Sequence, residues 1–157
     1  MRGNMNNNEI TAEGLNHLST MISVKDANEA VKFYVEIFGF KAHEVTNDRE
    51  GNVVFARLIY KGINLMIAPP NPIEEEDFMS PPVSSNCPPQ VSFYVYCDNL
   101  EESYSKAKNY GLKFLHDKEI KFWGDKAFRV LDPNGYIWNF ATKFTEHDAT
   151  KVPREVF

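Results

Sequence analysis

The sequence of 157 residues has few cysteines and no long apolar run. Its two cysteines, Cys87 and Cys97, are too few for a disulfide framework, and neither has the histidine or cysteine neighbours of a zinc site. We therefore expect reduced thiols and a cytoplasmic protein. No stretch approaches the roughly 18 apolar residues of a membrane span, so no membrane partner is expected.

Basic residues and catalytic signatures are also scarce. Lys and Arg number 17 against 22 Asp and Glu, which gives a formal net charge of −5. This balance argues against nucleic acid as a partner, because phosphate binding needs clustered cations. The sequence lacks a phosphate-cradling glycine loop, a nucleophile elbow and a spaced His/Cys zinc pattern. Small molecules, cations and proteins stay open as partners, and the last class includes a second copy of the chain in a homodimer.

What the sequence does contain is an internal repeat. Asp26 opens an amphipathic segment that ends at Gly39, and Asp98 opens a second that ends at Gly111. Both segments span the same distance (39 − 26 = 13; 111 − 98 = 13). Apolar residues recur at helical spacing within each. We predict two equivalent helices, capped by the aspartates and ended by the glycines.

Strand patterns surround each predicted helix. Segments 17–24 and 91–97 alternate before the helices, so one set of side chains, the more apolar one, should face the helix and the other should face away. Segments 53–60 and 63–68 follow the first helix, and segments 127–131 and 136–142 follow the second. The last two are joined by Asp132-Pro133-Asn134-Gly135, a strong turn signal. Each half therefore predicts one βαβββ module.

This organisation predicts the α+β class, with one domain at 14–145 made of tandem βαβββ modules at 14–68 and 90–145. A proline-rich linker at 69–89 joins the modules, and its acidic run at 74–77 is interpreted as a solvated surface. We expect a disordered N-terminal tail at 1–13 and a C-terminal tail at 146–157.

The tandem repeat resembles the vicinal oxygen chelate superfamily, in its glyoxalase, bleomycin-resistance and dioxygenase-like branch. The resemblance covers roughly residues 15–144. Its main motifs are Ile22-Ser23-Val24-Lys25-Asp26, Phe33-Tyr34, Phe38-Gly39, Trp123-Gly124-Asp125, Asp132-Pro133-Asn134-Gly135-Tyr136 and Trp138-Asn139-Phe140. It implies that the strands of each module curl into half a barrel and that the two halves form a ligand cup. It does not imply one activity, because the superfamily hosts many chemistries.

Metal-dependent members of that superfamily place His or Glu at one position on each of four strands. Carried onto this sequence, the positions are Ser19, then Asn64 or Met66, then Ser92 and Asn139. Asn64 follows from the glyoxalase-like alignment, and Met66 follows from the internal repeat (66 − 62 = 139 − 135). None is His, Glu, Asp or Cys, and serine and asparagine are weak ligands, so we expect no metal and no other cofactor.

The residues expected to bind a ligand lie on the strand faces turned away from the helices, with Trp123 near the mouth of the cup. They are Ser19, Met21, Asn64, Met66, Ser92, Tyr94, Trp123, Arg129 and Asn139. Arg129 joins this set if the turn at 132–135 contains a glycine bulge, because Asp132 then pairs with Tyr136 and Arg129 with Asn139. Its guanidinium could bind an oxyanion there or could extend to the rim.

Some other residues keep more than one interpretation. His17 is a general base, a lone ligand, or a solvated residue at the sheet edge. The rings of Tyr94, Tyr96 and Trp123 could stack on a flat ligand or a cation, or could pack between the two halves or at a dimer interface. His43 and His116 follow the two helix-ending glycines at equivalent places, and we expect them on a loop or strand surface.

Two functions follow from these observations. The first is a metal-free protein that binds a small organic molecule in its cup and so sequesters a drug or metabolite, which can by itself confer antibiotic resistance. The alternative is a lyase or dioxygenase-type enzyme of the same superfamily. Such an enzyme would use a metal at an unpredicted site, or would work without metal through His17, Tyr94 or Arg129.

Overall fold

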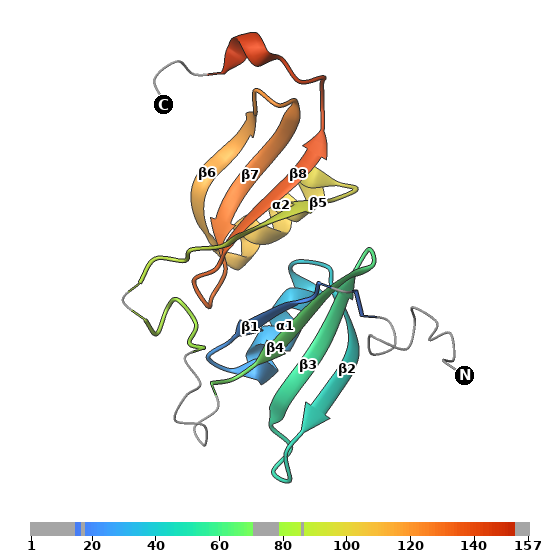
Figure 1. Ribbon diagram of the computed structural model, residues 1–157, viewed down its shortest axis with the longest axis vertical. Helices are drawn as coiled ribbons and strands as arrows, with labels where there is room; N and C mark the ends of the chain where they lie inside the picture. The colour runs from blue at the N-terminus through green and yellow to red at the C-terminus, as the bar shows by residue number, and fades with distance from the viewer. Residues whose placement is uncertain (1–14, 17, 71–78, 86, 153–157) are drawn as a thin grey trace, which may run out of the picture. The chain divides into compact units, whose positions relative to one another are not determined.

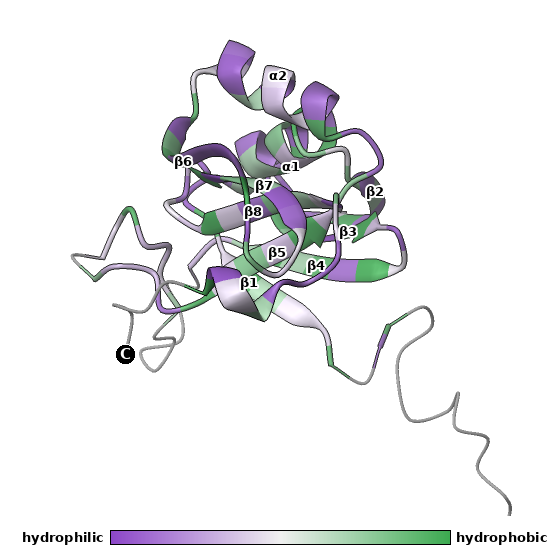
Figure 2. Cartoon of the chain, turned by 90° about the horizontal axis from the view of Figure 1, so that it is seen from above, coloured by the Kyte–Doolittle hydropathy of each residue, from purple (hydrophilic) through white to green (hydrophobic). Residues whose placement is uncertain are grey.

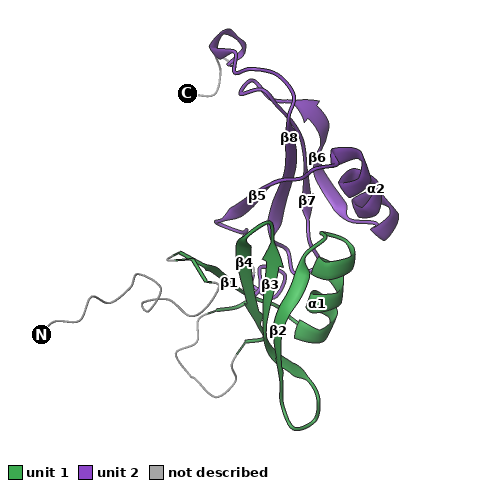
Figure 3. Ribbon diagram, turned by 90° about the vertical axis from the view of Figure 1, so that its right-hand side faces the viewer, with its two compact units in different colours: residues 1–80 green, residues 81–157 purple. Residues whose placement is uncertain are grey.

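A computed structural model describes residues 15–16, 18–70, 79–85 and 87–152. The chain divides into two compact units, residues 1–80 and 81–157, each with one sheet and one α-helix (Figures 1 and 3). Strand, helix and three further strands follow in the same order in both units, which confirms the predicted α+β fold of two βαβββ modules. The predicted N-terminal tail and the acidic run of the linker lie outside the described residues.

Unit 1 is a four-stranded mixed sheet, in the order β1-β4-β3-β2, covered by helix α1. Its elements are β1 (Thr20–Ser23), α1 (Ala27–Glu36), β2 (Lys41–Asn47), β3 (Val53–Tyr60) and β4 (Ile63–Ala68). The bounds of β3 and β4 are those predicted. Lys61 and Gly62 join them with φ angles of 47° and 80°, a turn whose twist matches that of the flanking strands.

Unit 2 repeats this arrangement in the order β5-β8-β7-β6. Its elements are β5 (Ser92–Tyr96), α2 (Leu100–Tyr110), β6 (Lys113–Ile120), β7 (Asp125–Leu131) and β8 (Ile137–Lys143). In both sheets the first strand runs parallel to the last and the other pairs are antiparallel. A 3-10 helix, Ala149–Lys151, follows β8 within the segment predicted as a C-terminal tail, and the Asp148 N–H donates to the Phe122 carbonyl at 3.0 Å.

The helices begin at side-chain caps. Helix α1 begins as predicted, because Asp26 accepts the backbone N–H of Glu29 at 3.1 Å. Helix α2 begins one residue later than predicted. Asn99, rather than Asp98, has the extended backbone of a cap, and its side chain accepts the Glu102 N–H at 3.1 Å. Aspartate and asparagine cap helices about equally well, so the sequence alone favoured neither of the two neighbours.

The helices end differently. Gly111 ends α2 in the left-handed conformation, at φ 85°, as predicted. The prediction that Gly39 ends α1 is wrong, because α1 stops at Glu36 and Ile37 is its cap. Gly39 still has a φ of 77°, so the glycine serves the turn after the helix instead.

The core of each unit lies between its helix and one face of its sheet. Large aromatic side chains fill both cores: Phe33, Tyr34 and Phe38 in unit 1, and Phe128, Trp138 and Phe140 in unit 2. Figure 2 shows much of α2 as hydrophilic, which fits a helix that buries only Leu100 and Ala107. Leu18 and Val91 were predicted to face the helices but are exposed, because both residues precede their strands.

The turn between β7 and β8 has the predicted register. The Asp132 N–H donates to the Tyr136 carbonyl at 3.0 Å, and Arg129 pairs with Asn139. The Asp132 carboxylate holds the turn, since one oxygen accepts the N–H groups of Asn134 and Tyr136, both at 2.9 Å. Its other oxygen accepts the indole N–H of Trp138 at 2.8 Å.

Within the described part of the chain, no helix combines the length and apolar character needed to cross a membrane.

Candidate functional site

The face of the unit 2 sheet that is turned away from α2 carries a row of polar side chains. Tyr94, Asn139, Arg129 and His116 are successive Cα partners across β5, β8, β7 and β6. Since side chains alternate along a strand, this row lies opposite the buried residues that pack beneath α2. We call this surface the open face of unit 2.

Arg129 and Asn139 form a fixed pair on this face. The Arg129 Nε donates to the Asn139 Oδ1 at 2.7 Å, and the Asn139 Nδ2 donates to the Phe93 carbonyl at 2.9 Å. Asn139 is 5% exposed, so both ends of its amide are committed in a site with little water. The two terminal nitrogens of Arg129 make no hydrogen bond within the described residues, and their N–H groups stay available to a ligand.

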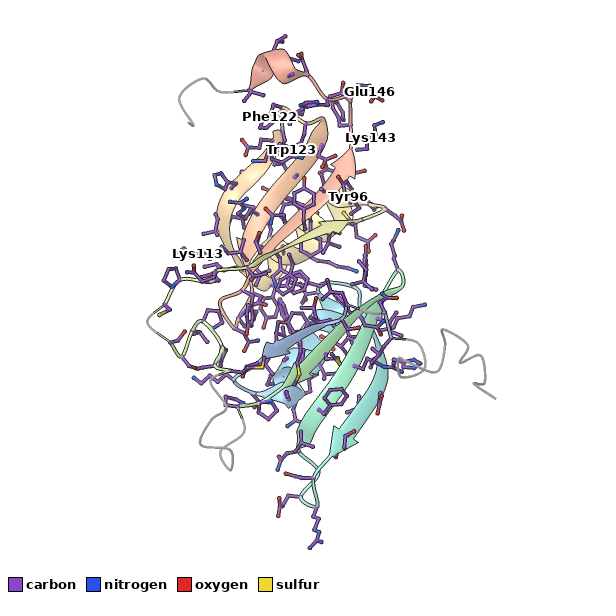
Figure 4. The ribbon with its side chains drawn as sticks, viewed as in Figure 1. Tyr96, Lys113, Phe122, Trp123, Lys143 and Glu146 are labelled. Carbon is purple, nitrogen blue, oxygen red and sulfur yellow. The ribbon has the colours of Figure 1, made fainter. Side chains whose placement is uncertain are left out.

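A buried carboxylate organises the other end of the open face. Asp125 is 4% exposed, and its Oδ2 accepts the Tyr94 and Tyr96 hydroxyls, each at 2.8 Å, and the Trp123 indole N–H at 2.9 Å. The Trp123 Nε1 also lies 3.1 Å from the Tyr94 hydroxyl oxygen. These four residues are called the Asp125 cluster below; Trp123 and Tyr96 are labelled in Figure 4.

The two tyrosines reach Asp125 by crossing a strand. They project from β5, Asp125 projects from β7, and β8 lies between. Ala141 of β8 is the Cα partner of Tyr96 and of Ala127, and both alanines are buried. Small side chains at these places leave room for the phenol rings to extend across the sheet.

The acidity of the tyrosines reflects this contact. Burial, together with the hydrogen bond to Asp125, raises the pKa of Tyr94 from 10.0 to about 12. The hydrogen bond to Asp125, with a smaller effect of burial, also raises the pKa of Tyr96. Both hydroxyls therefore keep their hydrogens at neutral pH and donate them to the carboxylate.

Gly124 sets the backbone between Trp123 and Asp125. Its φ is 101°, and a Cβ built there would lie 2.2 Å from the carbonyl oxygen of Thr145. The Gly124 carbonyl accepts the N–H groups of Phe144 and Thr145 at 3.0 and 2.9 Å. Only glycine allows this close approach, which fixes the direction of the residues on either side.

Sequence reasoning did not assign Asp125 to the site, and it considered Tyr96 only as a ring that could stack on a ligand or pack at an interface. Strand alternation placed Tyr96 on the same face as Tyr94, and Asp125 belongs to the Trp123-Gly124-Asp125 motif that carried part of the family resemblance. Neither signal shows that the two side chains meet across β8, because that contact depends on side-chain reach.

Unit 1 carries an equivalent row on its own helix-free face. Met21, Met66, Arg57 and Glu44 are successive Cα partners, so Arg57 occupies the place that Arg129 has in unit 2. Arg57 is buried, and its Nε lies 3.6 Å from the Glu44 carboxylate. Sequence reasoning missed Arg57, although the repeat offset would have found it (129 − 57 = 72 and 98 − 26 = 72).

The other residues singled out from the sequence take no part in the Arg129–Asn139 pair or in the Asp125 cluster. Asn64 is buried on β4, and the Ser19 hydroxyl donates to the Asn16 carbonyl at 3.1 Å. Ser92 is exposed at the start of β5, outside the Asp125 cluster. His17 lies outside the described residues. His43 and His116 are exposed on β2 and β6, as predicted.

Unit 2 also contains a cavity of about 550 Å³. Its lining comes from Pro82, Val83, Cys87 and Pro89, from the end of α2 and from the β7–β8 turn, and includes Lys113. None of the predicted ligand-binding residues lines it. A cup shared by both units stays a prediction.

The two units place the chain in the class of α+β proteins built from tandem βαβββ modules. Comparison with known sequences defines its family. The sequence model of the Glyoxalase/Bleomycin resistance protein/Dioxygenase superfamily matches residues 14–140. The chain belongs to this superfamily, as its motifs predicted.

Similar proteins extend over most of the chain. An uncharacterised protein of Mycobacterium bovis is 26% identical over 135 residues, which cover 86% of this chain and 88% of that protein. TioX from Micromonospora sp. ML1 has a TM-score of 0.61 at 20% identity and covers 83% of this chain and 100% of its own. A superfamily member from Sphaerobacter thermophilus has a TM-score of 0.57 at 21% identity, covering 81% and 97%. At these identities the solved structures show a shared fold.

The residues present do not fit the divalent cation of metal-dependent members. No group of three His, Cys, Asp or Glu side chains that could hold a metal ion occurs in the described ranges. At Asn139, the Arg129 Nε lies 2.7 Å from the only oxygen that could coordinate, so a cation there would face a guanidinium. Met66 likewise has an arginine, Arg57, as its Cα partner.

Proposed function

We propose that the chain binds a small organic molecule on the open face of unit 2 without a metal ion, and acts by sequestering it as a drug- or metabolite-binding protein would. The observation that carries the proposal is the Arg129–Asn139 pair. A guanidinium that is held by a buried amide, and whose terminal N–H groups make no hydrogen bond to the described residues, is oriented before a ligand arrives.

The chemistry of the face indicates a flat ligand with an acidic group. Arginine's planar fork matches a carboxylate or a similar oxyanion, which it can bind through two parallel hydrogen bonds. Tyr94 and Trp123 are 40% and 39% exposed, with ring centroids 6.5 Å apart, so they offer aromatic surface near the same strands. Stacking on these rings favours planar organic ligands.

The proposal also includes a cytoplasmic setting, a homodimer and, where the ligand is an antibiotic, resistance through sequestration. Cys87 and Cys97 are not joined in a disulfide, and reduced thiols of this kind are usual in a reducing compartment. Tyr96 is 56% exposed beside Tyr94, and exposed aromatic residues of this kind are common at interfaces between protein chains.

Thermal-shift screening of the full chain tests the proposal. The library pairs planar carboxylates, including metabolites and antibiotics, with their neutral amides, because a ligand that prefers the native state raises the unfolding temperature. We expect carboxylates to stabilise the protein more than their amides. Arg129→Ala should weaken a carboxylate at least tenfold, or about 1.4 kcal/mol, and Arg129→Lys should restore part of the loss.

Arg49→Ala removes an exposed arginine of unit 1 and serves as the charge-matched control. It should leave carboxylate binding unchanged. If a carboxylate binds equally well to wild type and Arg129→Ala, or if the amides bind as well as the carboxylates, the proposal is wrong.

A further inference from the structure

The cavity of about 550 Å³ lies where three parts of unit 2 meet, namely residues that precede β5, the end of α2 with the start of β6, and the β7–β8 turn. The Arg129–Asn139 pair and the Asp125 cluster do not line it. Tyr110 adds one aromatic ring, and the other apolar side chains of the lining are mostly aliphatic: Pro82, Val83, Pro89, Leu112, Leu131 and Pro133. We call it the proline-lined cavity. Small-molecule sites are usually apolar hollows of about 300–1,000 Å³, so this cavity is large enough for a ligand.

The walls of the proline-lined cavity are held together by close backbone contacts. The Val83 N–H donates to the Asn134 carbonyl at 3.0 Å. Gly135 has a φ of 88°, and a Cβ built on it would lie 3.0 Å from the Val83 nitrogen and 3.1 Å from the Pro82 Cβ. Prolines restrict the backbone in both of these walls, at Pro82 and at Pro133. The cavity is therefore shaped before a ligand arrives, which reduces the cost of ordering it on binding.

Two charged side chains line the cavity, and they differ in how far their charges are already satisfied. The Asp132 carboxylate is 5% exposed and accepts three N–H groups, two from its own turn and one from Trp138. Its charge is thus stabilised inside the turn. Lys113, at the start of β6 (Figure 4), is exposed and forms neither an ion pair nor a hydrogen bond with any residue that the structure describes. An anionic group of a ligand would therefore find its partner at Lys113.

The end of α2 opposes this attraction only weakly. A helix C-terminus carries about half a negative charge, because its last carbonyls lack partners. Here the Lys108 and Ala107 carbonyls accept the N–H groups of Gly111 and Leu112, both at 3.0 Å. The cap occupies two of these carbonyls, so the full positive charge of Lys113 decides the sign of the ligand.

We propose that the proline-lined cavity binds an aliphatic carboxylate, with the hydrocarbon chain in the cavity and the carboxylate at the Lys113 ammonium. Aliphatic walls favour a flexible chain, because they give little of the flat surface on which a planar ring stacks. An ammonium is a compact charge, so it binds a carboxylate without the planar fit that an arginine requires. Chain length and one negative charge should therefore determine the affinity.

This inference goes beyond the proposed function and does not depend on it. Leu131 follows Arg129 by two residues on β7 and lies on the same side of the sheet. The two sites are therefore neighbours with different ligands, a flexible acid at Lys113 and a planar acid at Arg129. Readouts that separate them must lie in the cavity itself.

Nuclear magnetic resonance of the ¹⁵N-labelled full chain provides such a readout. Gly111 and Gly135 line the cavity, and Gly51, in the β2–β3 turn of unit 1, is an internal control. The probes are octanoate, its neutral amide octanamide and the cation octylammonium. Octanoate should shift the N–H signals of Gly111 and Gly135 in a saturable way and leave Gly51 unchanged. It should bind at least about fivefold more tightly than the other two probes, the effect of one charge-assisted hydrogen bond at an exposed site.

Chain length and the Cys87 thiol give two further readouts. From butanoate through hexanoate to octanoate, affinity should rise by about two- to fourfold per methylene, the upper value being that of a fully buried CH₂. Cys87 is exposed and lines the cavity, whereas Cys97 is buried. Dithiodipyridine, a neutral thiol reagent, should react first at Cys87, and a Cys87→Ser variant identifies this fast phase by its loss. Octanoate should slow the fast phase, and acetate, which has no chain to bury, should not.

Lysine variants locate the charge that is responsible. Lys113→Met keeps a long side chain and removes its charge, so octanoate should weaken by about fivefold or more while octanamide binds as before. Lys113→Arg should retain most of the octanoate affinity. Lys41 is the matched control, because it is exposed and stands at the same place in the first half of the repeat (113 − 41 = 72; 98 − 26 = 72). Lys41→Met should leave octanoate binding unchanged.

Four results would overturn the proposal. They are octanamide or octylammonium binding as tightly as octanoate, no saturable shift of Gly111 and Gly135, octanoate affinity that is unchanged in Lys113→Met, and octanoate weakened by Arg129→Ala instead of by Lys113→Met. The last result would place the carboxylate at Arg129. Because the readouts lie in the cavity and no planar carboxylate is used, failure here is separate from failure of the proposed function.

Discussion

The Arg129 Nε and the Asn139 Oδ1 are joined by a 2.7 Å hydrogen bond between neighbouring strands, and Asn139 is the partner held by a second hydrogen bond. Its Nδ2 is held by the Phe93 carbonyl, and it is 5% exposed. The amide therefore sets the direction of the guanidinium, and loss of the amide affects both stability and the position of Arg129.

Asn139→Ala should lower the free energy of unfolding by about 1–3 kcal/mol, because the Phe93 carbonyl and the Arg129 Nε lose their partner in a buried place. Urea denaturation measures the change. Asn109→Ala, an exposed substitution on α2, is the control and should stay within about 0.5 kcal/mol of wild type. A loss no larger than that of the control would show that the amide does not hold this face together.

The Arg129–Asn139 register could be predicted from sequence because it depends on local rules. The turn residues from Asp132 to Gly135 specify a bulge, and strand alternation then determines which residues face each other. The bounds of β3 and β4 were predicted for the same reason. One error arose where neighbouring residues have equal propensity, at Asp98 and Asn99.

The Asp125 cluster could not be predicted in the same way. Its hydrogen bonds join β5 to β7 across β8, so they depend on strand order, on the small size of Ala141 and on side-chain rotamers. None of these is a local property of the sequence. Arg57 could have been predicted from the sequence. It lies at the position of Arg129 in the first half of the repeat, and a residue-by-residue comparison of the two halves would have identified it.

Asp132 gives a second prediction, about the turn that sets this register. Asp132→Asn should lower the free energy of unfolding by about 1–3 kcal/mol, because an amide cannot accept hydrogen bonds at both of its ends. Wild-type Asp132 accepts the N–H groups of Asn134 and Tyr136 at one oxygen and Trp138 at the other. Trp138 fluorescence during urea denaturation measures the change. Glu36→Gln, at the exposed end of α1, should cause no comparable loss, and equal stability of the two variants would contradict the prediction.

Metal content gives a third prediction. After incubation with excess Zn²⁺, Ni²⁺, Mn²⁺ or Fe²⁺ and then dialysis, elemental analysis should find well below one ion per chain. Ser19, Asn64 or Met66, Ser92 and Asn139 occupy the superfamily's ligand positions, and serine, asparagine and methionine hold these ions weakly. A content of about one tightly held ion per chain would contradict the prediction, and His17 would then be the first residue to substitute.

The fourth prediction concerns the pH at which Tyr94 ionises. Its pKa is raised from 10.0 to about 12, by burial and by the hydrogen bond to Asp125. A pKa that is higher in the folded than in the unfolded chain stabilises the fold fully below the unfolded value. This stabilisation is lost as the pH rises through the folded value.

Ultraviolet difference titration of wild type against Tyr94→Phe isolates this hydroxyl, and Trp138 fluorescence shows the range over which the fold persists. We expect Tyr94 to stay protonated well above pH 10, and to ionise at lower pH in Asp125→Asn, where the negative charge is gone. Ionisation of Tyr94 near pH 10 in the folded wild type, or at an unchanged pH in folded Asp125→Asn, would show that the carboxylate does not hold its hydrogen.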